Sequence, residues 1–151
     1  MPQDQENEPL GRLLGQVCHL HHSMARAAFD ALGLYRGQPP VLHALWEREG
    51  LTHTELTARL HVTPATISKM IRRMEKAGFV IRRPDSEDQR VSRVYLTDAG
   101  RAIRSDVQQA LAAMEAQTLD GLTPEEQALL RQLLLRLREN LVCATGEDIA
   151  F

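Results

Sequence analysis

Residues 63–97 read TPATISKMIRRMEKAGFVIRRPDSEDQRVSRVYLT, and this stretch decides the fold. Thr63 is a typical helix N-cap, and Pro64 suits the first helical position because proline has no N–H to leave unpaired there. Apolar residues then recur at three- and four-residue spacing, which predicts a helix over residues 64–77 with one buried stripe. The stripe consists of Ile67, Met70, Ile71 and Met74. Gly78 supplies the left-handed residue that ends the helix.

A β-hairpin is predicted to follow this helix. Residues 79–83 and 91–96 are rich in β-branched and aromatic side chains, and the turn-forming run PDSEDQ separates them. This hairpin is the only sheet signal in the chain. Upstream, a capping box of Thr52 and Glu55 opens a short helix, with Leu51 placed as a staple residue. Two short helices followed by a hairpin predict a winged helix-turn-helix.

Longer helices are predicted on both sides of this unit. Amphipathic spacing indicates helices over residues 10–32 and from the Pro39-Pro40 pair to about residue 50. After the hairpin, Thr97 caps one long helix, and a second capping box at Thr123 opens the last one. The last helix carries leucine around more of its circumference than one core-facing stripe requires. This excess predicts a partner helix from a second subunit.

The expected fold is therefore mainly α with a small β-hairpin wing. It is a winged helix-turn-helix (residues 35–97) between an N-terminal arm and dimerisation helix (1–34) and C-terminal dimerisation helices (98–151). These parts are expected to form one compact chain rather than independent domains.

Composition narrows the class of protein. A chain of 151 residues with 43% hydrophobic and 25% charged residues is typical of one soluble globular domain. No apolar run is long enough to span a membrane, and residues 1–9 are acidic and polar, unlike a signal peptide, so we expect a cytoplasmic protein. Cys18 and Cys143 are too few for a disulfide framework and are expected to be buried, inert thiols. No catalytic constellation has usable spacing, so neither an enzyme nor a cofactor is expected.

The net charge of −2 hides an uneven distribution. Residues 69–93 contain eight basic and four acidic side chains, a net charge of +4, whereas residues 1–68 carry −2 and residues 94–151 carry −4. A cationic segment framed by anionic ones is typical of a localised phosphate-binding surface. Double-stranded DNA is the expected partner.

The outer face of the helix over residues 64–77 presents small and hydroxyl side chains first and cations afterwards. Small side chains let a helix enter the major groove closely, so that Thr66 and Lys69 can reach base edges. Ser68, Arg72 and Arg73 are placed for phosphates. The candidate DNA-binding residues are Thr63, Pro64, Ala65, Thr66, Ser68, Lys69, Arg72, Arg73, Asp88 and Arg90. The alternative interpretation is a solvated basic helix face.

The turn of the hairpin offers a second contact. A protruding turn stiffened by Asp85 and Asp88 can place the guanidinium of Arg90 in the narrow, electronegative minor groove. Asp88, two residues from Arg90, is expected to hold that guanidinium in one orientation. A plain surface ion pair is the alternative.

Four motifs resemble the MarR family: TPATISK (63–69), MEKAGFV (74–80), DQR (88–90) and LTDAG (96–100). The similarity covers about residues 10–142, and the aspartate-x-arginine wing followed by leucine-threonine-x-x-glycine is more specific than a generic helix-turn-helix. The resemblance implies an obligate homodimer that binds pseudo-palindromic operators as a repressor or occasionally an activator. It implies that Thr66 and Lys69 face bases, Ser68 and Arg73 phosphates, and Arg90 the minor groove.

The resemblance also implies release of DNA by a small phenolic or other lipophilic anionic effector. His21, Met24, His43 and Trp46 are expected on the facing sides of the first two helices and are candidates for such a pocket, with core packing as the alternative.

Cys18, His21 and His22 are weak candidates for a metal site. Their spacing of i, i+3 and i+4 places the three side chains on one helical face, where they could offer ligands to zinc or copper. Two or three ligands do not make a site, and no metal is expected. A second function class stays open, namely a winged-helix module that binds proteins without reading DNA, because the flanks of the cationic segment are acidic.

Overall fold

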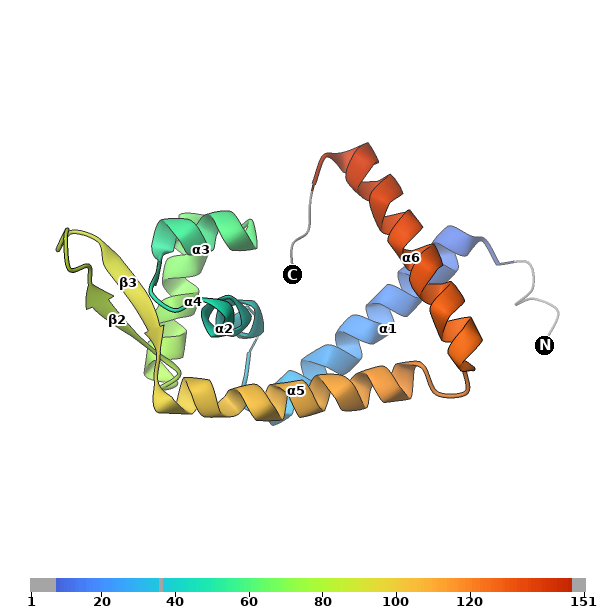
Figure 1. Ribbon diagram of the computed structural model, residues 1–151, viewed down its shortest axis with the longest axis horizontal. Helices are drawn as coiled ribbons and strands as arrows, with labels where there is room; N and C mark the ends of the chain where they lie inside the picture. The colour runs from blue at the N-terminus through green and yellow to red at the C-terminus, as the bar shows by residue number, and fades with distance from the viewer. Residues whose placement is uncertain (1–7, 36, 148–151) are drawn as a thin grey trace.

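The computed structural model describes residues 8–35 and 37–147, which fold into a winged helix-turn-helix lobe with long helices extending from it (Figure 1). The elements in chain order are α1 (Leu10–Ala31), α2 (Gln38–Glu47), β1 (Leu51–Thr52), α3 (His53–Leu60), α4 (Pro64–Lys76), β2 (Val80–Pro84), β3 (Ser92–Leu96), α5 (Asp98–Thr118) and α6 (Pro124–Thr145). In Figure 1 the sheet and α2–α4 lie at one end, and α5 leads away from them toward α6.

The buried core lies in the winged lobe. Its members come from α2, α3, α4 and the sheet, together with Leu34 before α2 and Val107 on α5. Ile67, Ile71 and Met74 of α4 are completely buried, as the helical spacing predicted. Met70, the fourth residue of the predicted stripe, is half-buried and packs against the edge of this core.

The predicted caps are present at four helix starts. Thr52 and Glu55 form both halves of the capping box of α3, and Thr123 forms the same motif with Glu126 at α6. Thr63 accepts a hydrogen bond from the backbone of α4, and Thr97 accepts one from the backbone of α5. Each cap satisfies a backbone N–H that the helix start leaves unpaired, which fixes where these helices begin.

The hairpin was the only sheet signal in the sequence, but the sheet contains one strand more than the hairpin. The sheet has three strands in the order β1-β3-β2, and β1 pairs antiparallel with β3 through Leu51↔Val94 and Thr52↔Arg93. A two-residue strand is too short to show a period-two pattern, and the position of Leu51 in the sequence also suits a staple of α3. The third strand makes β3 the central strand and joins the wing to the start of α3.

The wing, α2 and α5 meet at Gly100. The Trp46 indole nitrogen donates to the Gly100 carbonyl oxygen at 2.8 Å, and the Thr97 backbone N–H donates to the Phe79 carbonyl oxygen at 3.0 Å. A Cβ atom at position 100 would lie 2.1 Å from that same Phe79 oxygen. No residue larger than glycine therefore fits at this position of the leucine-threonine-x-x-glycine motif without a shift of the backbone.

The long helices α1 and α6 leave apolar surface uncovered. Neither helix has a buried residue, although α1 packs against α5. Cys18 on α1 and Cys143 on α6, both predicted to be buried, are exposed because the described elements leave their helix faces uncovered. Within residues 8–35 and 37–147, no helix is long and apolar enough to cross a membrane.

Gly100→Ala should destabilise the protein by roughly 2–4 kcal/mol, because the new methyl group meets backbone that cannot move aside. Urea unfolding at one fixed protein concentration measures this loss. Ala102→Ser, at an exposed position of the same helix, is the control and should change the free energy of unfolding by less than about 0.7 kcal/mol. A Gly100→Ala protein as stable as wild type would contradict the close approach at Phe79.

Candidate nucleic-acid interface

The exposed side of α4 carries a straight row of small and basic side chains. Ala65, Lys69, Arg72 and Lys76 recur at intervals of four, three and four residues, on the side opposite the buried stripe, and all four are exposed. Thr66 and Arg73 lie along one edge of this row, and Ser68 lies along the other. The candidate residues on α4 thus share one face that α2, α3 and the sheet leave open.

The first turn of α4 is ordered by hydroxyl groups. The Thr63 hydroxyl oxygen accepts a hydrogen bond from the Thr66 backbone N–H at 3.2 Å and lies 2.8 Å from the Thr66 hydroxyl oxygen. Pro64 and Ala65 at this end are exposed and short, so the backbone of the helix start is accessible to a ligand. A hydroxyl can form more than one hydrogen bond, so Thr66 keeps capacity for a base or phosphate.

Ion pairing divides the eight cations of residues 69–93 into two groups. Arg82 makes a two-pronged contact with Glu75 of α4, with nitrogen–oxygen distances of 2.9 and 2.8 Å, and Arg93 binds Asp85. In the part of the chain that the structure describes, the other six make no ion pair with a carboxylate: Lys69, Arg72, Arg73, Lys76, Arg83 and Arg90. The uncompensated positive charge of residues 69–93 therefore lies on α4 and the wing.

One carboxylate organises the turn of the wing. The Asp85 Oδ1 atom accepts hydrogen bonds from the backbone N–H groups of Glu87 at 2.8 Å and Asp88 at 3.1 Å, and its Oδ2 atom accepts one from the Arg93 side chain. These contacts lower the pKa of Asp85 to about 2, with the Arg93 hydrogen bond as the largest cause. The turn is stiffened by Asp85, as predicted.

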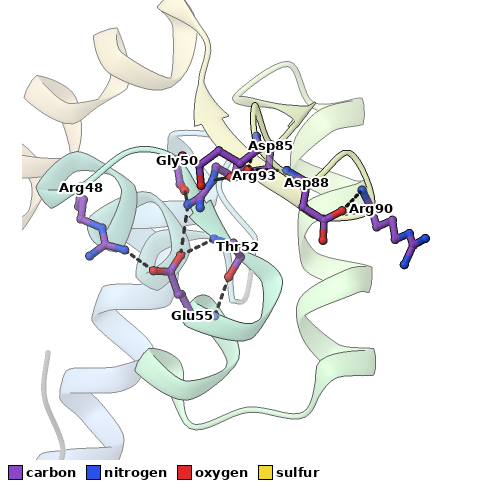
Figure 2. A network of polar contacts seen from close by, with 9 residues as sticks. Arg48, Gly50, Thr52, Glu55, Asp85, Asp88, Arg90 and Arg93 are labelled. Carbon is purple, nitrogen blue, oxygen red and sulfur yellow. Dashed lines mark hydrogen bonds and ion pairs between the residues drawn. The ribbon is translucent and has the colours of Figure 1, made fainter.

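Asp88 acts on Arg90 in a different way from the one predicted. Its Oδ1 atom accepts a hydrogen bond from the Arg90 backbone N–H at 3.0 Å, and among the described contacts it makes none with the guanidinium. Figure 2 shows the Arg90 side chain pointing away from the rest of the network. Aspartate readily bonds a backbone N–H two residues later in a turn, so Asp88 fixes the backbone and leaves the guanidinium available.

A polar network joins the wing to α3 (Figure 2). Arg93 Nη1 donates to the Gly50 carbonyl oxygen at 2.8 Å and lies 3.8 Å from Glu55 Oε2. That same Glu55 oxygen accepts from the Thr52 backbone N–H at 2.8 Å, the contact that does most to lower the pKa of Glu55. The sequence did not indicate this role of Arg93, because the signal for it is the unpredicted strand β1.

The four effector candidates do not gather within one protomer, so the expectation of facing positions on α1 and α2 was wrong. Met24 of α1 lies near Thr118 of α5, with a sulfur–oxygen distance of 4.0 Å, whereas Trp46 of α2 bonds to Gly100. Eighteen residues of helix separate those two α5 positions, a distance of about 27 Å. His43 is exposed beside Trp46, and His21 is exposed on α1.

The weak metal candidates also remain apart from any larger ligand set. Cys18, His21 and His22 are exposed on α1, and His22 Nδ1 lies 2.8 Å from the Cys18 carbonyl oxygen. Over residues 8–35 and 37–147, no three histidine, cysteine, aspartate or glutamate side chains are grouped to hold a metal ion.

The sequence is similar to a known protein family and to a named repressor. The sequence model described as the MarR family matches residues 34–92. The HTH-type transcriptional repressor Rv2887 of Mycobacterium tuberculosis (strain ATCC 25618 / H37Rv) is 30% identical over 132 residues, which cover 87% of this chain and 95% of that repressor.

Solved structures agree with the sequence comparison. The reduced form of MarR from E. coli is 28% identical, with a TM-score of 0.75, and the match covers 86% of this chain and 96% of that one. A mutant of E. coli MarR complexed with operator DNA is also 28% identical, with a TM-score of 0.71, and the match covers 87% and 95% of the two chains.

Asp85→Asn should destabilise the protein at neutral pH and have little effect near pH 2. The folded-state pKa of Asp85 is about 2, below its ordinary value, so its contribution is complete above about pH 4 and is lost as the pH falls toward 2. Urea unfolding of both proteins across this range measures the difference. Glu87→Gln removes a carboxylate from the same turn and serves as the control. A difference that does not depend on pH would contradict the Asp85–Arg93 contact.

Proposed function

The chain belongs to the MarR family, and we propose that it acts as a homodimer whose two winged helices read the half-sites of a pseudo-palindromic operator. It is a DNA-binding transcriptional regulator and not an enzyme. The finer proposal rests mainly on one observation. Six cations that have no carboxylate partner within residues 8–35 and 37–147 lie on the exposed face of α4 and on the wing that follows it.

In this proposal α4 enters the major groove. Thr66 and Lys69 contact base edges, while Ser68, Arg72 and Arg73 contact phosphates. Thr63, Pro64 and Ala65 allow the helix start to approach the DNA closely, and the backbone N–H groups there favour a phosphate. Arg90 enters the adjacent minor groove, and Asp88 holds its backbone. The unpaired cations support DNA over the alternative of a protein-interaction module.

The uncovered leucines of α6 support the proposed dimer. Leu129, Leu133, Leu137 and Leu141 recur every four residues and are between 43% and 57% exposed. An apolar stripe of this length on a helix with no buried residue is typical of a subunit interface. On α1, Leu10, Leu13, Val17 and Leu20 are also exposed and extend the same kind of surface.

We also propose that the protein represses transcription and that a small molecule releases it from DNA. The mycobacterial relative is named a repressor, and we extend that role to this chain. A small phenolic or lipophilic anion is the proposed effector. Since Met24 and Trp46 are far apart in one protomer, we do not propose that they line one pocket within it. Titration of the operator complex with small phenolic acids tests this part, and failure of every such acid to release DNA would contradict it.

Arg90→Ala should weaken operator binding by about tenfold or more and lower the salt dependence of binding by about one counterion per subunit. The measurement is operator affinity over a series of salt concentrations. Arg104→Ala, which removes the same charge from an exposed position on α5, is the control and should bind like wild type. Wild-type affinity and slope for Arg90→Ala would show that the wing does not contact DNA.

Leu137→Glu should raise the dissociation constant of the dimer by roughly two orders of magnitude or more, because each interface would bury unpaired carboxylates. Sedimentation over a range of protein concentrations measures the change. Arg131→Glu places the same side chain well away from the leucine stripe and should leave the dimer intact. If both variants sediment like wild type, α6 is not the dimer interface.

A further inference from the structure

The outer half of the wing is held by polar contacts rather than by the core. Val80, where β2 begins, is buried, whereas Arg82, Arg83 and Pro84 are exposed. On β3 the last buried residue toward the turn is Val94. A two-stranded hairpin is only marginally stable alone, so specific side-chain contacts have to fix the direction in which this half points.

Arg93 lies where three parts of the molecule meet. In the sheet it is paired with Thr52 of β1 on one side and with Arg83 of β2 on the other. Its Nε atom donates to Asp85 in the wing turn, and its Nη1 atom donates to the Gly50 carbonyl oxygen just before β1. One guanidinium therefore connects the turn of the wing to the strand that leads into α3.

Arg83, the neighbour of Arg93 in the sheet, lacks such contacts and is a useful comparison. The two arginines are directly opposite each other on β2 and β3, so their side chains share one face of the sheet. Like charges in that position repel each other. Asp85 neutralises Arg93, whose side chain is only 35% exposed, while the Arg83 guanidinium lies 5.6 Å from the centre of the Tyr95 ring and has no carboxylate partner among the described residues.

We propose that Arg93, acting through Asp85, is a positioning residue for DNA binding that holds the wing, and with it Arg90, in a fixed place relative to α4. The contacts form a continuous chain. Asp85 binds Arg93 with one oxygen and the backbone N–H groups of Glu87 and Asp88 with the other, and Asp88 binds the backbone N–H of Arg90. This role rests on the proposed function, because it assumes that Arg90 contacts the operator.

The physical consequence is a difference in the entropy of binding. With the Arg93 contacts in place, Arg90 is already positioned when α4 enters the major groove. Without them the wing has to be ordered when DNA binds, and ordering backbone is costly in conformational entropy. Arg93 itself contacts no phosphate in this account, because its charge is paired with Asp85 and its Nε and Nη1 atoms donate to Asp85 and to the Gly50 carbonyl oxygen.

The test is operator affinity of the full-length Arg93→Met protein over a series of salt concentrations, measured alone and combined with Arg90→Ala. Arg93→Met should weaken binding about tenfold or more without changing the salt slope, since no phosphate contact is lost. In the Arg90→Ala background the same change should cost less than about twofold, because the wing no longer contributes. Asp85→Asn should reproduce both results. It also carries the test if Arg93→Met does not fold.

Arg101→Met is the matched control. Arg101 also makes ion pairs, with Glu49 and Asp98, but these include neither the wing turn nor Arg90, so the variant should bind the operator like wild type. A salt slope lowered by about one per subunit in Arg93→Met would mean that Arg93 binds phosphate itself, and an equal loss in the Arg90→Ala background would mean that it does not act through Arg90. Either result overturns the inference. Wild-type binding by Arg90→Ala would instead overturn the proposed wing contact.

Discussion

β3 pairs with β1 on one side and with β2 on the other, and the placement of the DNA-binding groups depends on this double pairing. Val94 and Leu96 of β3 are buried in the same core as Ile67 and Ile71 of α4. Because Ile67 and Ile71 are buried, the basic face of α4 points outward. The strand pairing places the wing beside that face. One strand thus sets both surfaces that we propose to contact DNA.

The distribution of charge explains how a chain with a net charge of −2 can bind a polyanion. Glu75 and Asp85, two of the four acidic residues in the cationic segment, each pair with an arginine that supports the wing. The other six cations, which make no ion pair with a carboxylate among the described residues, are the ones that we propose to contact DNA. The ion pairs therefore fix the geometry of the wing, and we propose that the unpaired cations supply affinity for DNA.

Much of the fold could be predicted because its signals are local. Thr52, Thr63, Thr97 and Thr123 each cap a helix start at the predicted position, and Gly78 adopts the left-handed conformation after α4. The candidate residues of α4 were found for the same reason, since a helical period shows which side faces outward.

The errors arose where contacts join distant parts of the chain. Strand β1 has only two residues, and the role of Arg93 depends on Gly50, which lies 43 residues earlier. Asp88 accepts a hydrogen bond from the backbone rather than the side chain of Arg90, because the turn places that N–H group beside its carboxylate. The effector candidates Met24 and Trp46 contact opposite ends of α5, which helical spacing within α1 and α2 cannot show. Leucine content suggested that α6 needs a partner, and the exposed stripe on that helix agrees with it.

The central claim is that two copies of this winged unit read DNA together, with α4 in the major groove and Arg90 in the minor groove. Footprinting of the complex with an operator selected from random DNA tests it most directly, using methylation protection for the major groove and hydroxyl radicals for the minor groove. The account predicts a two-fold symmetric pattern, in which major-groove protections about 34 Å apart, or a whole multiple of that spacing, each adjoin a protected minor groove. A single asymmetric footprint, or major-groove protection without the neighbouring minor groove, would contradict it.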